Sequence, residues 1–502
     1  MSHFNVLTQP WIPVIDLNGK RKLLGILDTL EQAHQIKELE DANPTYEYGV
    51  FRFLCTFLMD VYRPEDWKVL ADIYDEGRFD MEKVQNYIKQ CETEGVSFDL
   101  FDKETPFLQT KYNEEYDKNL VSIARLNIAM PRGNNHIHFE HRQETEQSLT
   151  YAEAARGLCA LNLFCTSEAQ GYSSTVNSVP PLYFVFQASN LFGSLVYSML
   201  TREEGKEVNY DTPPVVWRNN EEVVPKQKET STSVLYGMLY PCRRVLLRSE
   251  MGGIVKRMYF CQGKNYVGYD SWQDPHVSYC ITDKGKSSLK PEIEKEPWRN
   301  IATILGKGPT SPVFVNRIIE HKLADEVAVK VYGVATHKKR VAQYLDMQKG
   351  HLRMPRLIAE NETKRNRIED IIVAAERMSQ ELGKCLNDCF QEKKKEEKKK
   401  DKNKKKMHNS IFAVQAEFLQ QCRDTVLQDL FDEMAAVPEN KASECTDKYL
   451  DKFGKKCMAC FDQAADTLFL TGRELLTRQK MRKKLFNALW LVGRDLERDT
   501  KG

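Results

Sequence analysis

One apolar stripe constrains the C-terminal part of the chain more than any other feature. Its members follow one another in steps of three and four residues, and they are Ile368, Ile371, Ala375, Met378, Leu382, Cys385 and Cys389. This spacing places all of them on one face of an α-helix. Three more helical runs follow, at residues 411–434, 443–470 and 474–492. Long amphipathic helices with short polar connections predict an antiparallel four-helix bundle over residues 363–502.

The preceding residues, 1–362, contain signals for both helices and strands. Residues 48–62 are apolar with helical spacing, and Pro64 sets the end of this predicted helix. Thr150 and Glu153 have the spacing of a capping box, which predicts that a second helix begins there.

Other segments of this part have the features of strands. Asn18-Gly19 follows a short apolar run and is typical of a hairpin turn. Residues 234–247 and 255–266 predict two strands on either side of the turn-forming residues 251–253, and residues 328–334 predict another. We therefore expect an α+β fold, in which a large mixed α/β domain precedes the bundle.

Composition narrows the classes of function. Of the 502 residues, 41% are hydrophobic and 29% are charged, which is enough apolar material for a sizeable core. The net charge is only +1, so a nucleic-acid surface must be a local patch. Residues 180–200 are too polar for a membrane helix, and the N-terminus does not look like a secretory signal. We expect a cytoplasmic protein with no membrane partner, whose 13 cysteines are mostly reduced thiols.

A lysine-rich run lies between the first two predicted bundle helices. Residues 391–406 contain ten lysines and four acidic residues, a local charge of +6. One interpretation is a solvated, flexible interhelical loop over residues 391–408, and the other is electrostatic contact with a phosphate backbone. No aromatic residue is interleaved before Met407, so base stacking is not expected there.

Motifs of known catalytic sites are absent. The sequence has no phosphate-binding G-x-x-x-x-G-K-[ST], no H-E-x-x-H, no G-x-S-x-G and no dinucleotide-binding glycine pattern. This favours a non-enzymatic protein that uses no cofactor.

Two clusters could in principle bind a metal ion. The first consists of cysteines in helical patterns, namely Cys385, Cys389, Cys457 and Cys460. We interpret these as small buried apolar side chains, because structural zinc sites usually lie in loops. The second consists of His136, His138 and His141, and we favour an exposed polar loop over a metal site because no partner cluster is evident.

Three loops have side chains suited to contact with DNA. Residues 129–141 are turn-forming and contain Arg132, which can contact phosphate, and Phe139, which can stack or wedge. Residues 170–175 are mostly small, so their backbone can approach a groove closely. Residues 336–340 end in three consecutive cations that can bind phosphates. Each pattern alone also fits an ordinary solvated turn.

Several stretches together resemble one family. They are residues 4–14 (FNVLTQPWIPV), 105–110 (TPFLQT), 135–141 with 152–155 (AEAA), Trp272-x-Asp274-Pro275-His276, and Val331-Tyr332-Gly333 before a basic turn. In this order they are similar to elements of the large subunit of the type I-E CRISPR surveillance complex, Cascade (the CasA family).

This resemblance implies a non-catalytic subunit. It would recognise the protospacer-adjacent motif in duplex DNA from the minor groove and split the duplex beside it, while a guide RNA reads the target sequence. The implied partners are double-stranded target DNA with its displaced strand, the CRISPR RNA-containing Cascade subunits (backbone, handle-capping and small subunits) and a helicase-nuclease.

The resemblance also assigns DNA-binding residues. Phe139 corresponds to the aromatic residue of the family's first loop, and residues 171–175 correspond to its glycine loop. Lys264 corresponds to its minor-groove lysine. His337 and Lys338 correspond to the tip of its wedge. The full predicted set is Phe139, Gly171, Tyr172, Ser173, Ser174, Lys264, His337, Lys338, Lys339 and Arg340. The sequence departs from the family where the glycine loop is largely Ser and Thr, and where the wedge tip has His and Lys in place of Asn and Gln. We find no paired cysteines for a structural zinc in this part, since Cys242 and Cys261 are isolated.

Two other functions remain open on the sequence alone. One is a helical adaptor or scaffold that binds protein partners without recognising DNA. The other is a hydrolase that uses the His136, His138 and His141 cluster.

Overall fold

The computed structural model describes residues 3–130, 147–166, 172, 175–206, 208–219, 221, 223–269, 272–283, 285–293, 295–337, 340–397, 403–468 and 472–499. Side chains within its helices and strands are described except at residues 282, 337, 340–345, 390–397, 403–409, 467, 468, 472–474 and 494–499. The chain divides into two compact units. The first comprises Met1–Pro297, Gly308–His321 and Ala328–Leu352, and the second Trp298–Lys307, Lys322–Val327 and Arg353–Gly502. The expected boundary at residues 362 and 363 lies within this second unit.

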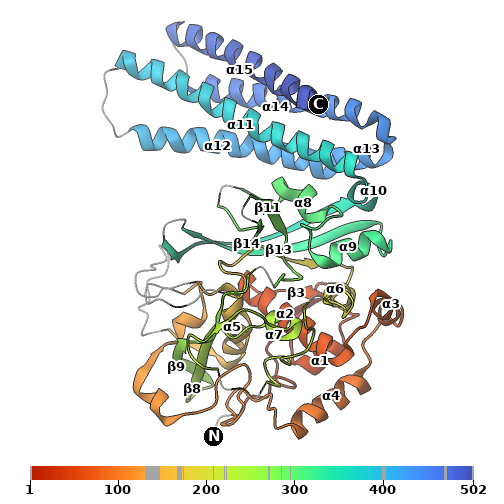
Figure 1. Ribbon diagram of the computed structural model, residues 1–502. Helices are drawn as coiled ribbons and strands as arrows, with labels where there is room; N and C mark the ends of the chain where they lie inside the picture. The colour runs from red at the N-terminus through yellow and green to blue at the C-terminus, as the bar shows by residue number, and fades with distance from the viewer. Residues whose placement is uncertain are drawn as a thin grey trace. The chain divides into compact units, whose positions relative to one another are not determined.

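Helix α2 (Pro44–Tyr62) forms the centre of the first unit (Figure 1). Asn43 caps its N-terminus by accepting a hydrogen bond from the amide of Thr45, and it ends where Arg63 adopts a left-handed conformation before Pro64. Nearly every residue of α2 is buried. The predicted helix is therefore confirmed, and it begins four residues earlier than the apolar run indicates.

Helix α5 (Tyr151–Phe164) packs against α2. The predicted capping box is present, with Thr150 and Glu153 each accepting from the other's backbone amide. Gly49 of α2 lies so close to α5 that a Cβ there would come within 2.7 Å of the Ala160 amide nitrogen. The absence of a side chain at this glycine permits the close packing of the two helices.

The strands of the first unit form small sheets around these helices. The predicted hairpin at Asn18-Gly19 is confirmed as β1 (Ile12–Asp16) and β2 (Arg21–Leu24), to which β3 (Ile36–Leu39) adds in the order β2-β1-β3. Strands β8 (Arg243–Glu250) and β9 (Ile254–Gln262) form the hairpin predicted around residues 251–253, and β4 (Leu120–Ser122) and β5 (Leu149–Thr150) also pair with β9.

The prediction of one strand over residues 234–247 is wrong in its first part. Residues Val234–Met238 form helix α7, and Ser233 caps it by accepting from the amide of Tyr236. All five helical residues are buried. A short run that is buried on every side shows no periodicity, so its spacing does not distinguish a helix from a strand.

The predicted strand at residues 328–334 is confirmed and is longer than expected. It belongs to β13 (Glu326–His337), which with β14 (Arg340–Pro355) and β6 (Tyr183–Phe186) forms a sheet in the order β14-β13-β6. The first unit also contains the helices α1 (Ile26–Glu31), α3 (Trp67–Asp75), α4 (Met81–Thr93), α6 (Leu191–Ser198) and α9 (Val313–Glu320), and two 3-10 helices at Glu114–Asn119 and Ile123–Leu126. Its remaining strands are β7 (Lys228–Glu229), β10 (Asn265–Tyr266), β11 (Tyr279–Thr282) and β12 (Gly285–Ser288).

The second unit contains the four predicted long helices (Figure 1). They are α11 (Glu362–Glu397), α12 (Asn403–Thr425) continued by a π-helical turn at Val426–Leu430 and by α13 (Phe431–Ala436), α14 (Ala442–Leu468) and α15 (Gly472–Asp499). Helices α8 (Ile301–Leu305) and α10 (Arg356–Ala359) adjoin α11. All seven residues of the predicted apolar stripe on α11 are buried, which confirms it.

Helix occupies much of the lysine-rich run. α11 continues to Glu397 and α12 begins at Asn403, so the helices extend into residues 391–408 from both sides. Residues 398–402 lie outside the described residues. No helix in the described part of the chain is long and apolar enough to span a bilayer.

Candidate nucleic-acid interface

A buried arginine contacts one residue before and one residue within the predicted small-residue loop, 170–175. Arg243, at the start of β8, is 3% exposed. Its Nη2 donates a hydrogen bond of 2.7 Å to the carbonyl of Thr166, just before residues 167–171. Its guanidinium also lies 5.0 Å from the centre of the Tyr172 ring, just after them. Phe260 of β9 meets that ring edge-on at 5.8 Å, so Tyr172 is held between a cation and an aromatic side chain.

The residues that follow this loop are anchored in the core. The Asn177 side chain donates a hydrogen bond of 2.8 Å to Oδ2 of Asp274. The backbone N–H of Asn177 donates a hydrogen bond to Oγ1 of Thr175. Ser178 has a φ of 70°, in the left-handed region. This turn connects Thr175, the last residue of the predicted loop, to the buried carboxylate of Asp274.

Asp274 is itself fixed by an ion pair with α2. Nη1 and Nη2 of Arg52 donate to its two carboxylate oxygens at 2.6 and 2.8 Å, and both side chains are completely buried. Burial raises the pKa of the Asp274 carboxyl, but the charge and hydrogen bonds of Arg52 outweigh this effect, so its pKa lies below the ordinary value. The bidentate geometry makes this pair a rigid support for Asn177.

His276 completes the buried network. Nδ1 of its ring lies 3.2 Å from the Tyr48 hydroxyl, and Nε2 lies 2.9 Å from the carbonyl of Ser198. Burial, together with the positive charge of Arg52, lowers the pKa of His276 to about 3. The ring is therefore neutral at physiological pH, with one nitrogen donating and the other accepting.

Lys264, the predicted minor-groove lysine, is turned into the protein. Its side chain is 4% exposed, and its Nζ lies 2.7 Å from Oε1 of Glu229 and 5.2 Å from the centre of the Tyr236 ring. Burial lowers the pKa of the Lys264 ammonium, but the hydrogen bonds and electrostatic interactions with Glu229 and Tyr236 together outweigh it, so the pKa is raised overall. In this arrangement the positive charge of Lys264 is neutralised by Glu229 inside the protein. Contact between Lys264 and DNA would require this ion pair to break.

Three of the five residues predicted to form a basic turn belong to strands. β13 continues through Thr336 to His337 and β14 begins at Arg340, so the predicted turn over residues 336–340 is wrong at these three positions. The backbone of His337 and Arg340 is described, and their side chains are not. Lys338 and Lys339, with Phe139, Gly171, Ser173, Ser174 and the histidines 136, 138 and 141, lie outside the described residues.

The bundle cysteines are buried, as expected. Cys385, Cys389 and Cys457 are fully inaccessible, and Cys460 is 4% exposed. Burial raises the pKa of the Cys385 thiol to about 11 and that of Cys389 to about 12, which disfavours the thiolate that a metal ion needs. In the part of the chain that the structure describes, no group of three or more potential metal ligands occurs.

Sequence reasoning missed the residues that position these segments, namely Arg52, Arg243 and Asn177. A signal was available for Arg52, because it is the one Lys or Arg within the apolar run 48–62. A cation in a helix that is otherwise apolar needs a buried partner. That partner, Asp274, is 222 residues away in the sequence.

The fold and this site define a mixed α/β scaffold with a helical second unit, in which buried ion pairs and hydrogen bonds fix the segments next to the predicted loops. Comparisons with known proteins agree with that class. The family model described as CRISPR-associated protein Cse1 matches residues 5–458. The chain belongs to the Cse1 family.

Solved structures show the same fold at low sequence identity. Cse1 from Acidimicrobium ferrooxidans is 16% identical, with a TM-score of 0.77 and coverage of 99% of both chains. CasA from Thermus thermophilus is 19% identical, with a TM-score of 0.73 and coverage of 97% of this chain and 100% of that one. A chain of a structure described as a CRISPR RNA-guided surveillance complex is 17% identical, with a TM-score of 0.72 and coverage of 97% and 100%. Among curated proteins, none matches the chain.

Proposed function

We propose that this chain is a non-catalytic subunit of an RNA-guided surveillance complex, which recognises a short motif in duplex DNA and opens the duplex beside it. Family membership and the likeness to a chain of such a complex support this. The observation that carries the proposal is the pair of long neighbouring strands β13 and β14, because the sequence has Lys338 and Lys339 between them and β14 begins with Arg340. Inserting a wedge costs a few kcal/mol of stacking per base step, which phosphate contacts and guide pairing offset.

The proposed DNA-contacting residues keep the roles that the sequence assigns to them. They are Phe139, Gly171, Tyr172, Ser173, Ser174, Lys264, His337, Lys338, Lys339 and Arg340. The proposed partners are target DNA with its displaced strand, the CRISPR RNA-containing subunits, and a helicase-nuclease that this chain helps to recruit.

One experiment tests the proposal directly. The guide-loaded complex is assembled with and without this chain, and unwinding is measured on duplexes that differ only beside the target. We expect unwinding to depend on both the chain and the flanking sequence. Equal unwinding without the chain contradicts the proposal.

Replacing the two wedge lysines should change the salt dependence of duplex binding. Each phosphate contact contributes about −0.9 to the slope of log affinity against log salt concentration, so the Lys338→Ala, Lys339→Ala double variant should flatten that slope by about 1.8. The measurement is a titration of the complex with duplex at several salt concentrations. An unchanged slope removes both lysines from the phosphate contacts.

Phe139→Ala should separate duplex recognition from guide pairing. If the ring stacks or wedges at the motif, the variant complex binds motif-bearing duplex less tightly, by about tenfold for one lost stacking contact of 1–3 kcal/mol. Binding to single-stranded target should change little, because that strand needs no opening. Equal losses on both substrates assign Phe139 to packing.

A helical adaptor is the second candidate function, and one observation favours it. Helix α15 has large apolar side chains exposed to solvent, including Leu476 at 73%, Phe486 at 60% and Trp490 at 56%. Such a surface is typical of a protein-binding site. A mobility-shift assay distinguishes the two functions, because an adaptor leaves the binding of DNA by the guide-loaded complex unchanged.

A further inference from the structure

One end of the β8–β9 hairpin brings together two residues of the proposed DNA-contacting set. Gln262, the last residue of β9, pairs with Arg243, the first residue of β8. The guanidinium of Arg243 lies 5.0 Å from the centre of the Tyr172 ring. Lys264 follows Gln262 by two residues. Tyr172 and Lys264 therefore lie at the same end of this hairpin, although they are far apart in the sequence.

The backbone around Lys264 is fixed on both sides. The Lys264 amide donates a hydrogen bond of 3.0 Å to the carbonyl of Pro241. The Asn265 amide donates one of 2.7 Å to the carbonyl of Gln227. A Cβ on Gly263 would overlap the carbonyl oxygen of Pro241, so only glycine fits directly before Lys264. A change in the position of the ammonium must therefore come from the side chain of Lys264 alone.

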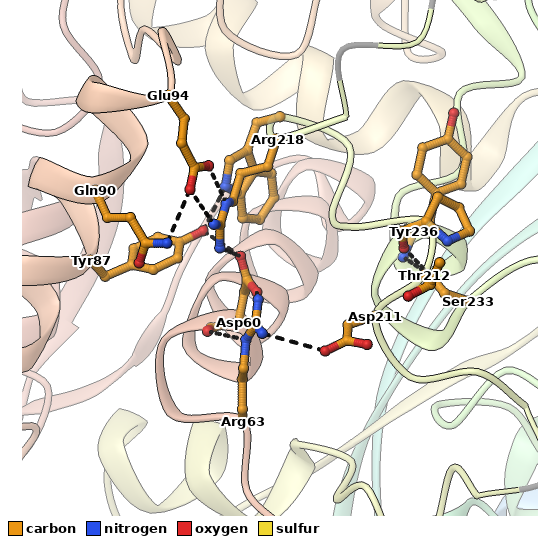
Figure 2. A network of polar contacts seen from close by, with 12 residues as sticks. Asp60, Arg63, Tyr87, Gln90, Glu94, Asp211, Thr212, Arg218, Ser233 and Tyr236 are labelled. Atoms are coloured by element: carbon orange, nitrogen blue, oxygen red, sulfur yellow. Dashed lines mark hydrogen bonds and ion pairs between the residues drawn. The ribbon is translucent and has the colours of Figure 1, made fainter.

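A carboxylate on β7 holds this side chain inside the protein. Nζ of Lys264 lies 2.7 Å from Oε1 of Glu229. The hydroxyl of Tyr240 donates a hydrogen bond of 2.7 Å to the other carboxylate oxygen. The ammonium also lies over the ring of Tyr236, whose amide donates to the side chain of Ser233 (Figure 2). Because the paired lysine is buried, it cannot contact DNA until it leaves Glu229.

Glu229 does not become a buried charge without a partner when the lysine leaves. Its side chain is 18% exposed, so water can reach the carboxylate. Tyr240 would still donate its hydrogen bond to this carboxylate. The pair of Arg52 and Asp274 differs, because neither side chain has exposed surface and breaking it would leave a completely buried charge. The pair of Lys264 and Glu229 can therefore open at a moderate cost in free energy.

We propose that Glu229 competes with DNA for the ammonium of Lys264 and so lowers the affinity of the chain for duplex. The inference rests on the proposed function, because it assumes that Lys264 contacts DNA. Glu229 itself does not touch DNA and acts through Lys264. Phosphates and base edges offer the ammonium acceptor atoms of the same kind as a carboxylate. Each contact that Lys264 makes with DNA is therefore weakened by the free energy needed to leave Glu229.

A neighbouring carboxylate supplies a matched control. Oε2 of Glu221 lies 3.7 Å from Nζ of Lys264, and the Glu221 side chain is 72% exposed. Glu221→Gln removes the same charge from the same surroundings, but solvent screens this longer contact. It leaves the short contact between Lys264 and Glu229 in place. A general effect of net charge on DNA binding would therefore be equal in Glu221→Gln and Glu229→Gln.

The test measures the equilibrium affinity of the guide-loaded complex for motif-bearing duplex. We expect Glu229→Gln to raise this affinity by about tenfold, because a neutral amide binds an ammonium less strongly than a carboxylate does. Glu221→Gln should stay within about twofold of the wild type. In a Lys264→Ala background, Glu229→Gln should also change the affinity by no more than about twofold, since no ammonium is left to release. Damage to the fold would lower the affinity, so it cannot produce the expected gain.

A second measurement uses the isolated full-length chain. Acetylation of Lys264 by acetic anhydride, followed by mass spectrometry, reports how accessible its amine is. The pKa of Lys264 is raised while it is paired, and the neutral amine is the form that reacts. We expect labelling of Lys264 to be about fivefold faster in Glu229→Gln than in the wild type, and unchanged in Glu221→Gln.

The inference is overturned if Glu229→Gln binds duplex no more tightly than Glu221→Gln does, or if its gain persists when Lys264 is alanine. Equal labelling of Lys264 in the two glutamine variants overturns it as well. If Lys264→Ala binds motif-bearing duplex as tightly as the wild type, the proposed role of Lys264 fails and the inference fails with it. If Lys264→Ala binds weakly and Glu229→Gln binds as the wild type does, that role stands and this inference alone falls.

Discussion

Replacing Asp274 with alanine is expected to lower the free energy of unfolding of the first unit by about 3–5 kcal/mol, the cost of leaving one member of a buried ion pair without its partner. Arg52 would keep its charge in a site with no solvent exposure, and Asn177 would lose its acceptor. Urea unfolding, monitored by far-UV circular dichroism, measures this change.

A surface ion pair provides the control for this prediction. Lys455 and Asp451, on α14, are bonded at 2.6 Å with both side chains largely exposed. Asp451→Ala should change the free energy of unfolding by less than about 1 kcal/mol, because solvent screens such pairs. Similar losses in the two variants contradict the assignment of Asp274 as a core support.

Acidification should destabilise the first unit through His276. The pKa of this ring is about 3 in the folded protein and 6.5 when unperturbed, so between these values the unfolded chain binds one more proton than the folded chain. The stabilisation is complete above pH 6.5 and is lost as the pH falls toward 3. At about 1.4 kcal/mol per pH unit, the loss between pH 6.5 and 4.5 is about 2–3 kcal/mol.

His276→Gln isolates this contribution. Glutamine does not titrate, so the free energy of unfolding of the variant should depend less steeply on pH over the same interval than that of the wild type. Keeping the measurements above pH 4.5 avoids the titration of Asp274, whose lowered pKa places its protonation at more acidic values. Equal slopes in the two proteins would show that His276 does not take up the proton.

The bundle illustrates what local spacing can predict. The stripe from Ile368 to Cys389 needs only the 3.6-residue period of a helix to be recognised, and all its members are buried as expected. The capping box at Thr150 is equally local, since its two residues are three apart. By contrast, residues 234–238 are buried on every side, and their pattern gave no basis for choosing helix over strand.

The candidate site shows where local spacing stops being informative. The sequence and its family resemblance indicated which loops to consider, and they predicted a basic turn at the end of the strand that became β13. They did not indicate that Lys264 pairs with Glu229, or that Arg243 joins Thr166 to Tyr172. These contacts depend on how separate strands and loops pack together.

The sequence by itself therefore determined the helical bundle, the main helix of the first unit, the strand that became β13 and the family to which the chain is similar. These features depend on residues a few positions apart, whose geometry the backbone fixes. Only the tertiary structure decided that Glu47 binds both β13 and β14 and that Arg52 meets Asp274. The physical reason is that a buried charge needs an opposite charge close to it in space, and the residue that supplies it can lie anywhere in the sequence. The local spacing of residues therefore does not predict such pairs.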